Sequence, residues 1–97
     1  MNYFYDVTED ILQELPNIKY DLAQLYALLV LVQGVNTTLQ NVHDAWSAWA
    51  INRRPDHKSL VPFKELSPEV QELDRKYRDA IVRVSERYYL RSYAHDV

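Results

Sequence analysis

Two tryptophans and three cations lie close together in the middle of the chain and are the residues best suited to hold a ligand. Trp46 and Trp49 are three residues apart, and Arg53, Arg54 and Lys58 follow them. Residues three apart share one face of a helix, so an indole there could stack on a nucleotide base while the cations bind its phosphate. The alternative, which aromatic spacing favours more often, is two core side chains beside a solvated loop.

The three histidines, His43, His57 and His95, do not follow a metal-binding pattern. A zinc site on a helix needs ligands such as two histidines four residues apart, and this sequence has no such pair. We expect His43 to be partly buried beside Trp46 and hydrogen-bonded to the backbone or to an acid. No metal and no cofactor are predicted. The candidate ligand-binding residues are His43, Trp46, Trp49, Arg53, Arg54, His57 and Lys58.

The sequence offers little support for enzymatic chemistry. The chain has no cysteine and a single glycine, which excludes a thiol nucleophile, a thiolate metal site and a glycine-rich phosphate loop. No serine lies in a Gly-x-Ser-x-Gly motif. The carboxylates fall on predicted solvent faces, whereas a catalytic acid or base needs burial or a neighbour of like charge. We therefore expect a protein that is not an enzyme.

Composition and charge describe one ordinary globular domain spanning residues 1–97. The chain is 47% hydrophobic and 26% charged. Residues 1–52 carry six acids and one base, and residues 53–97 carry eight acids and ten bases, so the two halves have opposite net charge and can attract each other. The net charge of −3 argues against binding to duplex DNA. No apolar run is long enough to span a membrane and no secretion signal is apparent, so we expect a cytoplasmic protein.

Apolar residues that recur at helical spacing predict an all-α fold, and the first two helices are the clearest. The first is expected to begin at Thr8 and to end before Pro16. The second is expected to be capped by Asp21, to run to Val32 and to stop at Gly34, the only glycine of the chain. Because apolar residues cover nearly all sides of the second helix, we expect it to be central and surrounded.

Two further helices are expected, separated by an extended segment. A cap within residues 36–38 would begin a third helix over residues 39–53, and the proline-containing segment 60–63 would form a strap over the core. Ser67, followed by a proline and an acid, is typical of a helix start, and a break near Asp74 is left open. The fold class is thus a small bundle of four main helices. The apolar face of the fourth is predicted to be Val70, Leu73, Tyr77, Ile81, Val84 and Tyr88.

Tyrosine is unusually frequent, with eight in the chain. Tyr77 is expected in the core, and the others, Tyr26 among them, concentrate toward the two chain ends. A tyrosine combines an apolar ring with a hydrogen-bonding hydroxyl, which suits an interface. If the ends meet, these rings either form a patch that a partner or a second copy covers, or simply close the bundle. The candidate interface residues are Tyr3, Tyr5, Tyr20, Tyr88, Tyr89 and Tyr93.

The segment VHDAWSAWAINRRPDHKSLVPFKELSPEVQELDRKY resembles a ryanodine-receptor repeat (RyR) domain over about residues 41–82. The likeness lies in a His-x-x-Trp pair, the LVPF-x-x-LSPE block and an Asp-Arg pair. The matching positions are His43, Trp46, His57, Leu60, Val61, Pro62, Phe63, Leu66, Pro68, Glu69, Asp74 and Arg75. The resemblance implies a helical regulatory or ligand-sensing module, and some members of that family bind adenine nucleotides. The whole chain also resembles small conserved proteins of actinobacterial phages, whose function is generally unassigned.

Two functions from different classes follow. The preferred one is a non-enzymatic phage protein that acts in the host cytoplasm and binds a host or phage protein through its tyrosine-rich or acidic surface. The alternative is a small nucleotide-binding module that sequesters a nucleotide signal. The loop over residues 51–56 is short for the RyR family, and Lys58 stands where that family usually has proline. RyR repeats often work as paired units, whereas this chain contains one, so a nucleotide pocket would need a homodimer.

Overall fold

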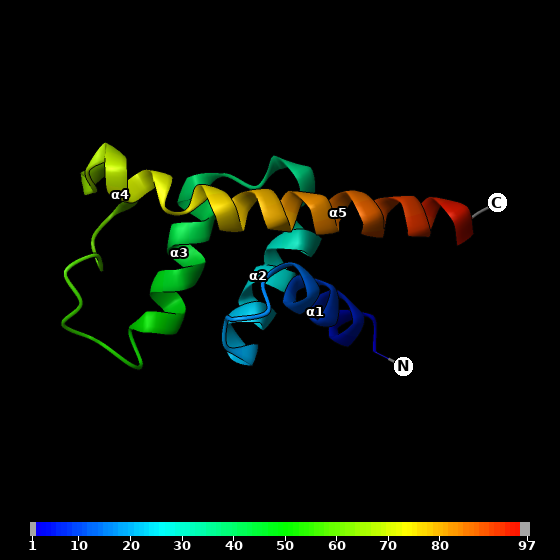
Figure 1. The fold of residues 1–97 in the computed structure, drawn as a ribbon, viewed down its shortest axis with the longest axis horizontal. Coiled ribbons are helices and arrows are strands. Elements are labelled where there is room, and N and C mark those ends of the chain that lie inside the picture. Colours follow the sequence, from blue (N-terminus) through cyan, green and yellow to red (C-terminus); the bar gives the residue numbers. More distant parts are fainter. Residues whose placement is uncertain (1, 96–97) are drawn as a thin grey trace.

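The protein is all-α and is described by a computed structural model over the backbone of residues 2–95 and the side chains of residues 2–90. Figure 1 shows the long helix α5 running along the molecule, with α1, α2 and α3 packed along one side of it. The described part contains no strand. The helices are α1 (Tyr3–Glu14), α2 (Tyr20–Val32), α3 (Leu39–Ala50), α4 (Pro68–Glu72) and α5 (Arg75–His95), with short 3₁₀ helices η1 (Gly34–Asn36) and η2 (Phe63–Glu65).

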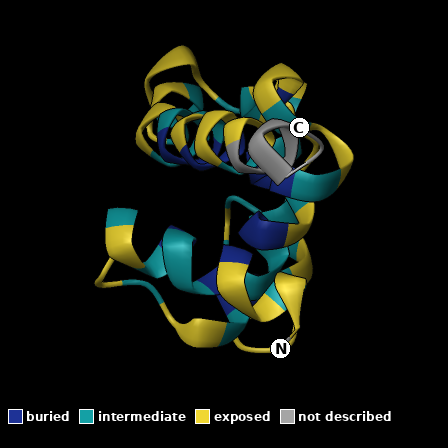
Figure 2. Cartoon of the chain, turned by 90° about the vertical axis from the view of Figure 1, so that its right-hand side faces the viewer, coloured by how far each residue is buried: buried dark blue, intermediate teal, exposed yellow. Residues whose placement is uncertain are grey.

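Helix α2 is the centre of the packing, because it contacts α1, α3 and α5. Ala23, Ala27 and Ala80 are fully buried, and their small side chains allow the helices to approach closely. Figure 2 shows that the buried residues lie on the sides of the helices that face one another. The larger buried apolar side chains each contribute about 1.5–3 kcal/mol by leaving water. They are Val7, Ile11, Leu15, Leu22, Tyr26, Val30, Val42, Ile81 and Val84.

The prediction that α2 is surrounded on all sides is wrong at one stripe. Leu28 and Val32 are four residues apart, so they share a face, and they are 46% and 62% exposed. Three neighbouring helices cannot cover the full circumference of a fourth, and this stripe is what remains. Tyr26 is 2% exposed, so it belongs to the core and not to a tyrosine cluster near the chain ends.

Helix α1 begins earlier than Thr8. The side chain of Asn2 accepts a hydrogen bond from the backbone N–H of Phe4 at 2.8 Å and caps the helix. Thr8 is buried inside the helix, where its hydroxyl donates to the carbonyl of Phe4 at 2.9 Å. Both residues are good caps by type. Starting the helix at the first of them allows Val7 to be buried at 1% exposure within the helix.

The junction between α2 and α3 follows the predicted stop and start, with one correction. Gly34 has a φ of +58°, the left-handed conformation that ends a helix. Thr38 caps α3 and forms a reciprocal pair of hydrogen bonds with Asn41. Asp21, the predicted cap of α2, lies inside the first turn, because the cap is Lys19 and the helix begins at Tyr20, two residues earlier than predicted.

The predicted fourth helix is divided in two. Ser67 caps α4 as expected, accepting from the N–H of Val70 at 3.3 Å. The chain then turns at Leu73 and Asp74 before α5 begins. Leu73 is consequently 68% exposed and does not belong to the core face on which it was placed. The strap is irregular as far as residue 62, and Phe63 begins the 3₁₀ helix η2, which contacts α3.

None of the helices in the described part is both long and apolar enough to cross a bilayer.

Candidate functional site

The predicted ligand-binding residues divide between two places, although three of them lie on α3. Trp46 and Trp49 are rotated by about 60° from each other around the helix axis, and different neighbours pack beside each of them. His43, Trp46 and His57 line one pocket against the junction of α4 and α5. Trp49, Arg53 and Arg54 line another site, against the start of α2. Lys58 is exposed and lines neither of these.

The second of these places, which we call the Trp49 site, is an open depression that also contains Lys19, Tyr20 and Asp21. The indole N–H of Trp49 donates to the carboxylate of Asp21 at 2.8 Å. The guanidinium of Arg53 lies 4.4 Å from the Trp49 ring centroid and also pairs with Asp21. One face of the indole, its donor and one cation are thus already engaged. A phosphate placed here would meet the carboxylate of Asp21.

The indole and the guanidinium stabilise the charged form of Asp21. The hydrogen bond from Trp49, and then the charge of Arg53, hold the pKa of the Asp21 carboxyl below its usual range. At the Trp49 site, Asp21, Trp49 and Arg53 therefore form a structural cluster whose groups pair with one another, and Lys19 and Arg54 are exposed at its rim.

The first place, which we call the aromatic pocket, is a cavity of about 260 Å³ between α2, α3, the loop that follows α3, and the junction of α4 and α5. The Trp46 and His57 rings meet edge to face with centroids 5.0 Å apart. On the opposite helices, the rings of Tyr26 and Tyr77 are 6.0 Å apart. The lining residues are Tyr26, His43, Trp46, His57, Ser59, Leu66, Val70, Leu73, Asp74 and Tyr77.

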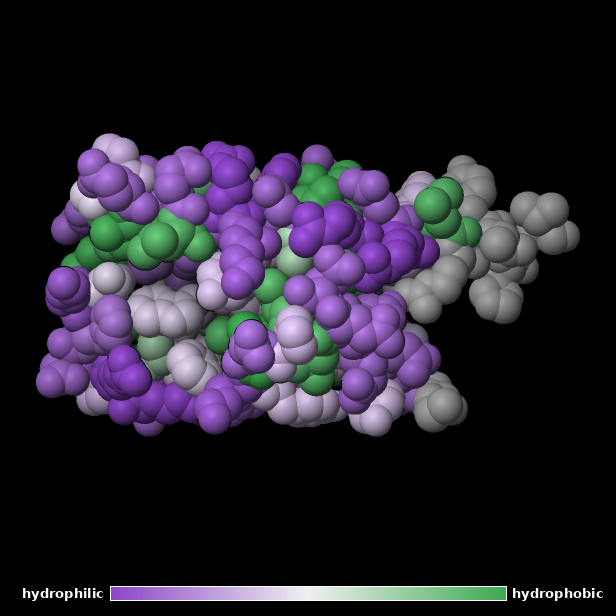
Figure 3. All heavy atoms as spheres, viewed as in Figure 1, coloured by the Kyte–Doolittle hydropathy of each residue, from purple (hydrophilic) through white to green (hydrophobic). Residues whose placement is uncertain are grey.

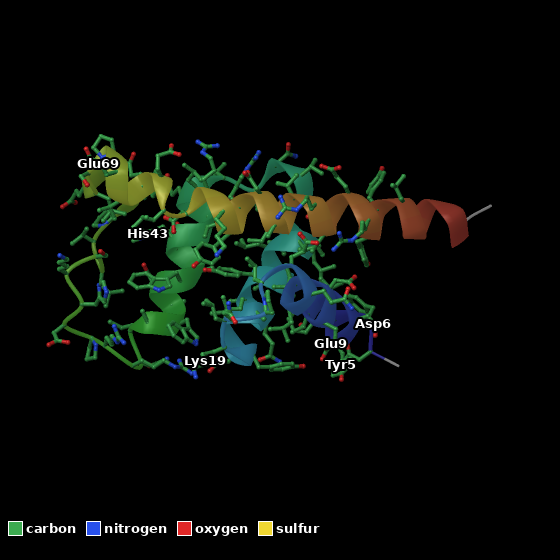
Figure 4. The ribbon with its side chains drawn as sticks, in the orientation of Figure 1. Tyr5, Asp6, Glu9, Lys19, His43 and Glu69 are labelled. Carbon is green, nitrogen blue, oxygen red and sulfur yellow. The ribbon has the colours of Figure 1, made fainter. Side chains whose placement is uncertain are left out.

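His43 holds the strap against α3. Its side chain is 3% exposed, and Nε2 lies 2.7 Å from the carbonyl oxygen of Val61. A carbonyl can only accept, so Nε2 carries the hydrogen. The ring stacks on Trp46 at a centroid distance of 5.9 Å and lies 6.0 Å from the ring of Phe63. The predicted buried, backbone-bonded histidine beside Trp46 is confirmed, and Figure 4 places it at the end of α3 nearest the junction of α4 and α5.

Asp74 is the acidic member of the aromatic pocket. Burial raises the pKa of its carboxyl, and His43 nearby opposes that effect. Burial, and then the charge of Asp74, raise the pKa of the Tyr26 hydroxyl. Sequence reasoning did not assign Asp74, Tyr26 or Tyr77 to a site. A signal was present in the spacing of Asp74 and Tyr77, which places them on one side of the start of α5, but nothing in the sequence indicates that Tyr26 faces them.

A third hollow, which we call the apolar groove, runs between the end of α2 and the second half of α5. Its volume is about 580 Å³. Val32, Val35 and Leu90 are 62%, 51% and 69% exposed. Figure 3 shows hydrophobic atoms in separate patches among hydrophilic ones, one of them at the end of α5. The lining residues are Val30, Leu31, Val32, Gln33, Gly34, Val35, Ser85, Glu86, Tyr88, Tyr89 and Leu90.

The predicted interface tyrosines occupy different surfaces. Tyr88 and Tyr89 line the apolar groove. Tyr20 lies at the Trp49 site, and Tyr3 and Tyr5 are exposed on α1. The helices of the two terminal segments do contact each other, since α1 packs on α5.

Tyr5 and Tyr93 complete the list of predicted interface tyrosines. Figure 4 shows Tyr5 and Glu9 near each other on α1, and the charge of Glu9, together with a hydrogen bond, raises the pKa of the Tyr5 hydroxyl. The side chain of Tyr93 lies outside the described side chains.

Among the described residues, no group of three or more His, Asp or Glu side chains is arranged to hold a metal ion.

Comparison with known proteins gives a family but no named relative. No curated protein matches this chain, and no solved structure matches it. One family model, described as "Domain of unknown function (DUF7701)", covers residues 2–86 and therefore most of the chain. By that match, the chain belongs to the DUF7701 family.

Proposed function

We propose that this protein is a non-enzymatic interaction module that binds an amphipathic helix of a partner protein in the apolar groove. The observation that carries the proposal is the exposure of Val32, Val35 and Leu90 around one hollow. Contiguous apolar surface of this kind on a soluble domain marks an interaction site. A groove between two helices is also the usual receptor for the apolar face of a third.

Charge indicates the chemistry of the partner. Among the side chains that the structure describes, Glu86 is the only charged one that lines the apolar groove, and its carboxylate has no ion pair with another of them. The nearby cations Arg83 and Arg87 are both engaged with Glu14. A partner helix with a basic residue beside its apolar face would pair with Glu86. The net charge of −3 also favours a positively charged partner.

The biological setting belongs to the same proposal. The likeness to small phage proteins suggests a partner from the host or the phage, met in the host cytoplasm, and a regulatory role for the complex. The likeness to RyR repeats suggests a regulatory module as well. Both are proposals that rest on the sequence motifs.

The nucleotide-binding alternative remains a prediction with less geometric support. In the Trp49 site, Arg53 covers one face of the indole and Asp21 neutralises Arg53. A nucleotide would have to displace the guanidinium and accept a carboxylate beside its phosphate. Thermal unfolding with adenine nucleotides and ADP-ribose tests it: a rise in midpoint that Trp49→Ala abolishes would support nucleotide binding.

Two designed peptides test the groove. Both are helical with the same leucine face, and one carries lysines and the other glutamates on its polar face. We expect the purified protein to bind the lysine peptide more tightly, as measured by fluorescence anisotropy. Val32→Asp should abolish binding because it places a charge in the groove. Ile51→Asp, which alters an aliphatic residue that is also about half exposed but lies at the end of α3, should have no effect.

The charge preference has its own test. Glu86→Lys should invert the order of the two peptides. The proposal is overturned if neither peptide binds, if Val32→Asp leaves binding intact, or if Glu86→Lys changes nothing. It is also overturned if sedimentation shows a dimer that Val32→Asp dissociates, because a second copy would then be the occupant of the groove.

A further inference from the structure

We propose that the aromatic pocket binds a small organic cation of the quaternary-ammonium class, held among the rings of Tyr26, Trp46 and Tyr77 with the carboxylate of Asp74 as its counter-charge. This site is separate from the apolar groove and does not depend on the function proposed for it. The inference rests on the walls of the pocket, its charge and its size.

The walls are aromatic on several sides and come from different elements. Tyr26 belongs to α2, Trp46 to α3, His57 to the loop between α3 and the strap, and Tyr77 to α5. The Tyr26–Tyr77 and Trp46–His57 centroid distances are 6.0 and 5.0 Å. Aromatic faces carry negative potential, and several rings around one space form the arrangement that recognises alkylated ammonium groups.

One ring of the pocket already contacts a cation. Nζ of Lys76, a residue that does not line the pocket, lies 5.7 Å from the centroid of the Tyr77 ring. The ring is therefore oriented and exposed well enough for a cation–π contact.

The charge of the pocket also selects a cation. Among the described residues that line it, Asp74 is the only acid and none is a lysine or an arginine. The Asp74 carboxylate forms no hydrogen bond or ion pair with the side chains and backbone described for this chain. A half-buried carboxylate without a partner is destabilised, and burial accordingly raises the pKa of this group. A bound cation would restore the missing counter-charge, whereas an anion would be repelled.

The size of the pocket excludes larger ligands. Its 260 Å³ lies below the range of about 300–1,000 Å³ that holds drug-sized molecules, so a nucleotide does not fit. A metal ion would need several free ligands, and Nε2 of His43 is already committed to Val61. A methylated ammonium group satisfies the aromatic walls and the single carboxylate together.

Trp46 provides the measurement. In a Trp49→Phe protein, Trp46 is the only tryptophan, and its emission reports occupancy of the pocket. The probes are tetramethylammonium, choline and 3,3-dimethylbutan-1-ol, which has the shape of choline without the charge. We expect a saturable change in emission with both cations and none with the alcohol at equal concentration.

Matched variants identify the counter-charge. Asp74→Asn keeps the shape and removes the charge, and it should weaken choline binding by about tenfold, the ratio that corresponds to 1.4 kcal/mol. Asp44→Asn, at an exposed position of α3 outside the pocket, should leave the affinity unchanged. Tyr77→Leu should also weaken binding, and circular dichroism verifies that each variant is folded.

Three results would overturn the proposal. They are the absence of a saturable response to either cation, an equal response to the neutral alcohol, and an affinity for choline that neither Asp74→Asn nor Tyr77→Leu reduces. The second of these would show a merely apolar pocket, and the third would show that the cation binds elsewhere.

Discussion

The carboxylate of Asp21 accepts hydrogen bonds from two side chains that follow it by 28 and 32 residues. Trp49 donates its indole N–H, and Arg53 both pairs with the carboxylate and lies over the indole. Each group thus satisfies the other two. The cluster joins the start of α2 to the end of α3, which gives it a structural role, and Arg53 already covers one face of the Trp49 indole.

The titration of Asp21 should report this cluster. We expect an NMR titration of its carboxyl to give a midpoint below the ordinary value of about 3.9. Because the folded pKa is lowered, the stability that this group contributes is present above the ordinary value and is lost as the pH falls through the folded one. Trp49→Phe should move the midpoint upward, and Trp46→Phe should not. A midpoint unchanged in Trp49→Phe would contradict the assignment of the indole N–H as the main cause.

The pKa of Asp74 is shifted in the opposite direction from that of Asp21. Its folded pKa is raised by burial, so the folded state binds more protons than the unfolded state just above the ordinary pKa, and stability falls as the pH rises through that range. At pH 7 the charged group is therefore a cost. The N-terminus of α5 offsets part of it, because the helix dipole favours a carboxylate there.

Asp74→Asn should consequently stabilise the protein at pH 7, by about 0.5 kcal/mol for a group that is partly exposed. A urea titration measures the change, and Asp44→Asn serves as the control. A loss of stability would show that the helix dipole outweighs burial. A residue that lowers stability and is aimed into a pocket is also what a binding site requires, since function commonly opposes stability at such positions.

The single residues show how far sequence can identify a site. His43 beside Trp46 could be predicted, because both lie on one helix at a spacing of three. The separation of Trp46 from Trp49 could not, because the spacing fixes only their angle around α3 and not which element packs beside each. Asp74, at the start of α5, lies close enough to Tyr26, in the middle of α2, for its charge to raise the pKa of the Tyr26 hydroxyl. No local sequence pattern connects residues so far apart in the chain.

At the level of elements, the helix ends depend on chemistry that is local and therefore readable. Gly34, the Ser67-Pro68 start and one of the candidate caps before α3 all act as predicted. The start of α1 was predicted wrongly because two good caps compete there, and burial of the intervening residues decides between them. The break at Asp74 has no proline or glycine to mark it, which is why it was left open.

The left-handed conformation of Gly34 at the end of α2 can be tested by substitution. A Cβ added at this position would meet no atom within 4 Å, so a substitution costs conformational energy and not a clash. Gly34→Ala should lower the free energy of unfolding by about 1 kcal/mol because of the positive φ. Gly34→Asn should cost less, since asparagine tolerates this conformation. Equal costs for the two variants in a urea titration would show that the left-handed conformation is not what matters here.

At the level of the whole molecule, the opposite charges of the two halves of the sequence meet in the fold as expected. Asp21 of the acidic half pairs with Arg53, and Glu14 pairs with Arg83 at 2.7 Å and Arg87 at 3.2 Å. The second group joins α1 to α5 across 69 and 73 residues of the sequence. Because both arginines are engaged with Glu14, neither pairs with Glu86. Glu86 is the only charged residue among the described side chains of the apolar groove, and its charge determines the partner that we propose.

The pair of arginines at Glu14 should make the packing of α1 on α5 sensitive to acid. The hydrogen bond from Arg83, and then that from Arg87, hold the pKa of Glu14 below its usual value of about 4.3. Its stabilising contribution is therefore present above that value and is lost as the pH falls through the lower folded pKa. Glu14→Gln should reduce the free energy of unfolding at pH 7 by about 0.5–1 kcal/mol, the upper range for partly exposed ion pairs. The difference from the wild type should shrink toward zero in acid, as measured by urea titrations at several pH values.

A double-mutant cycle with Arg83→Met supplies the control, because the effect of Glu14→Gln should be smaller without Arg83. A difference that does not change with pH would show that Glu14 acts through packing and not through its charge.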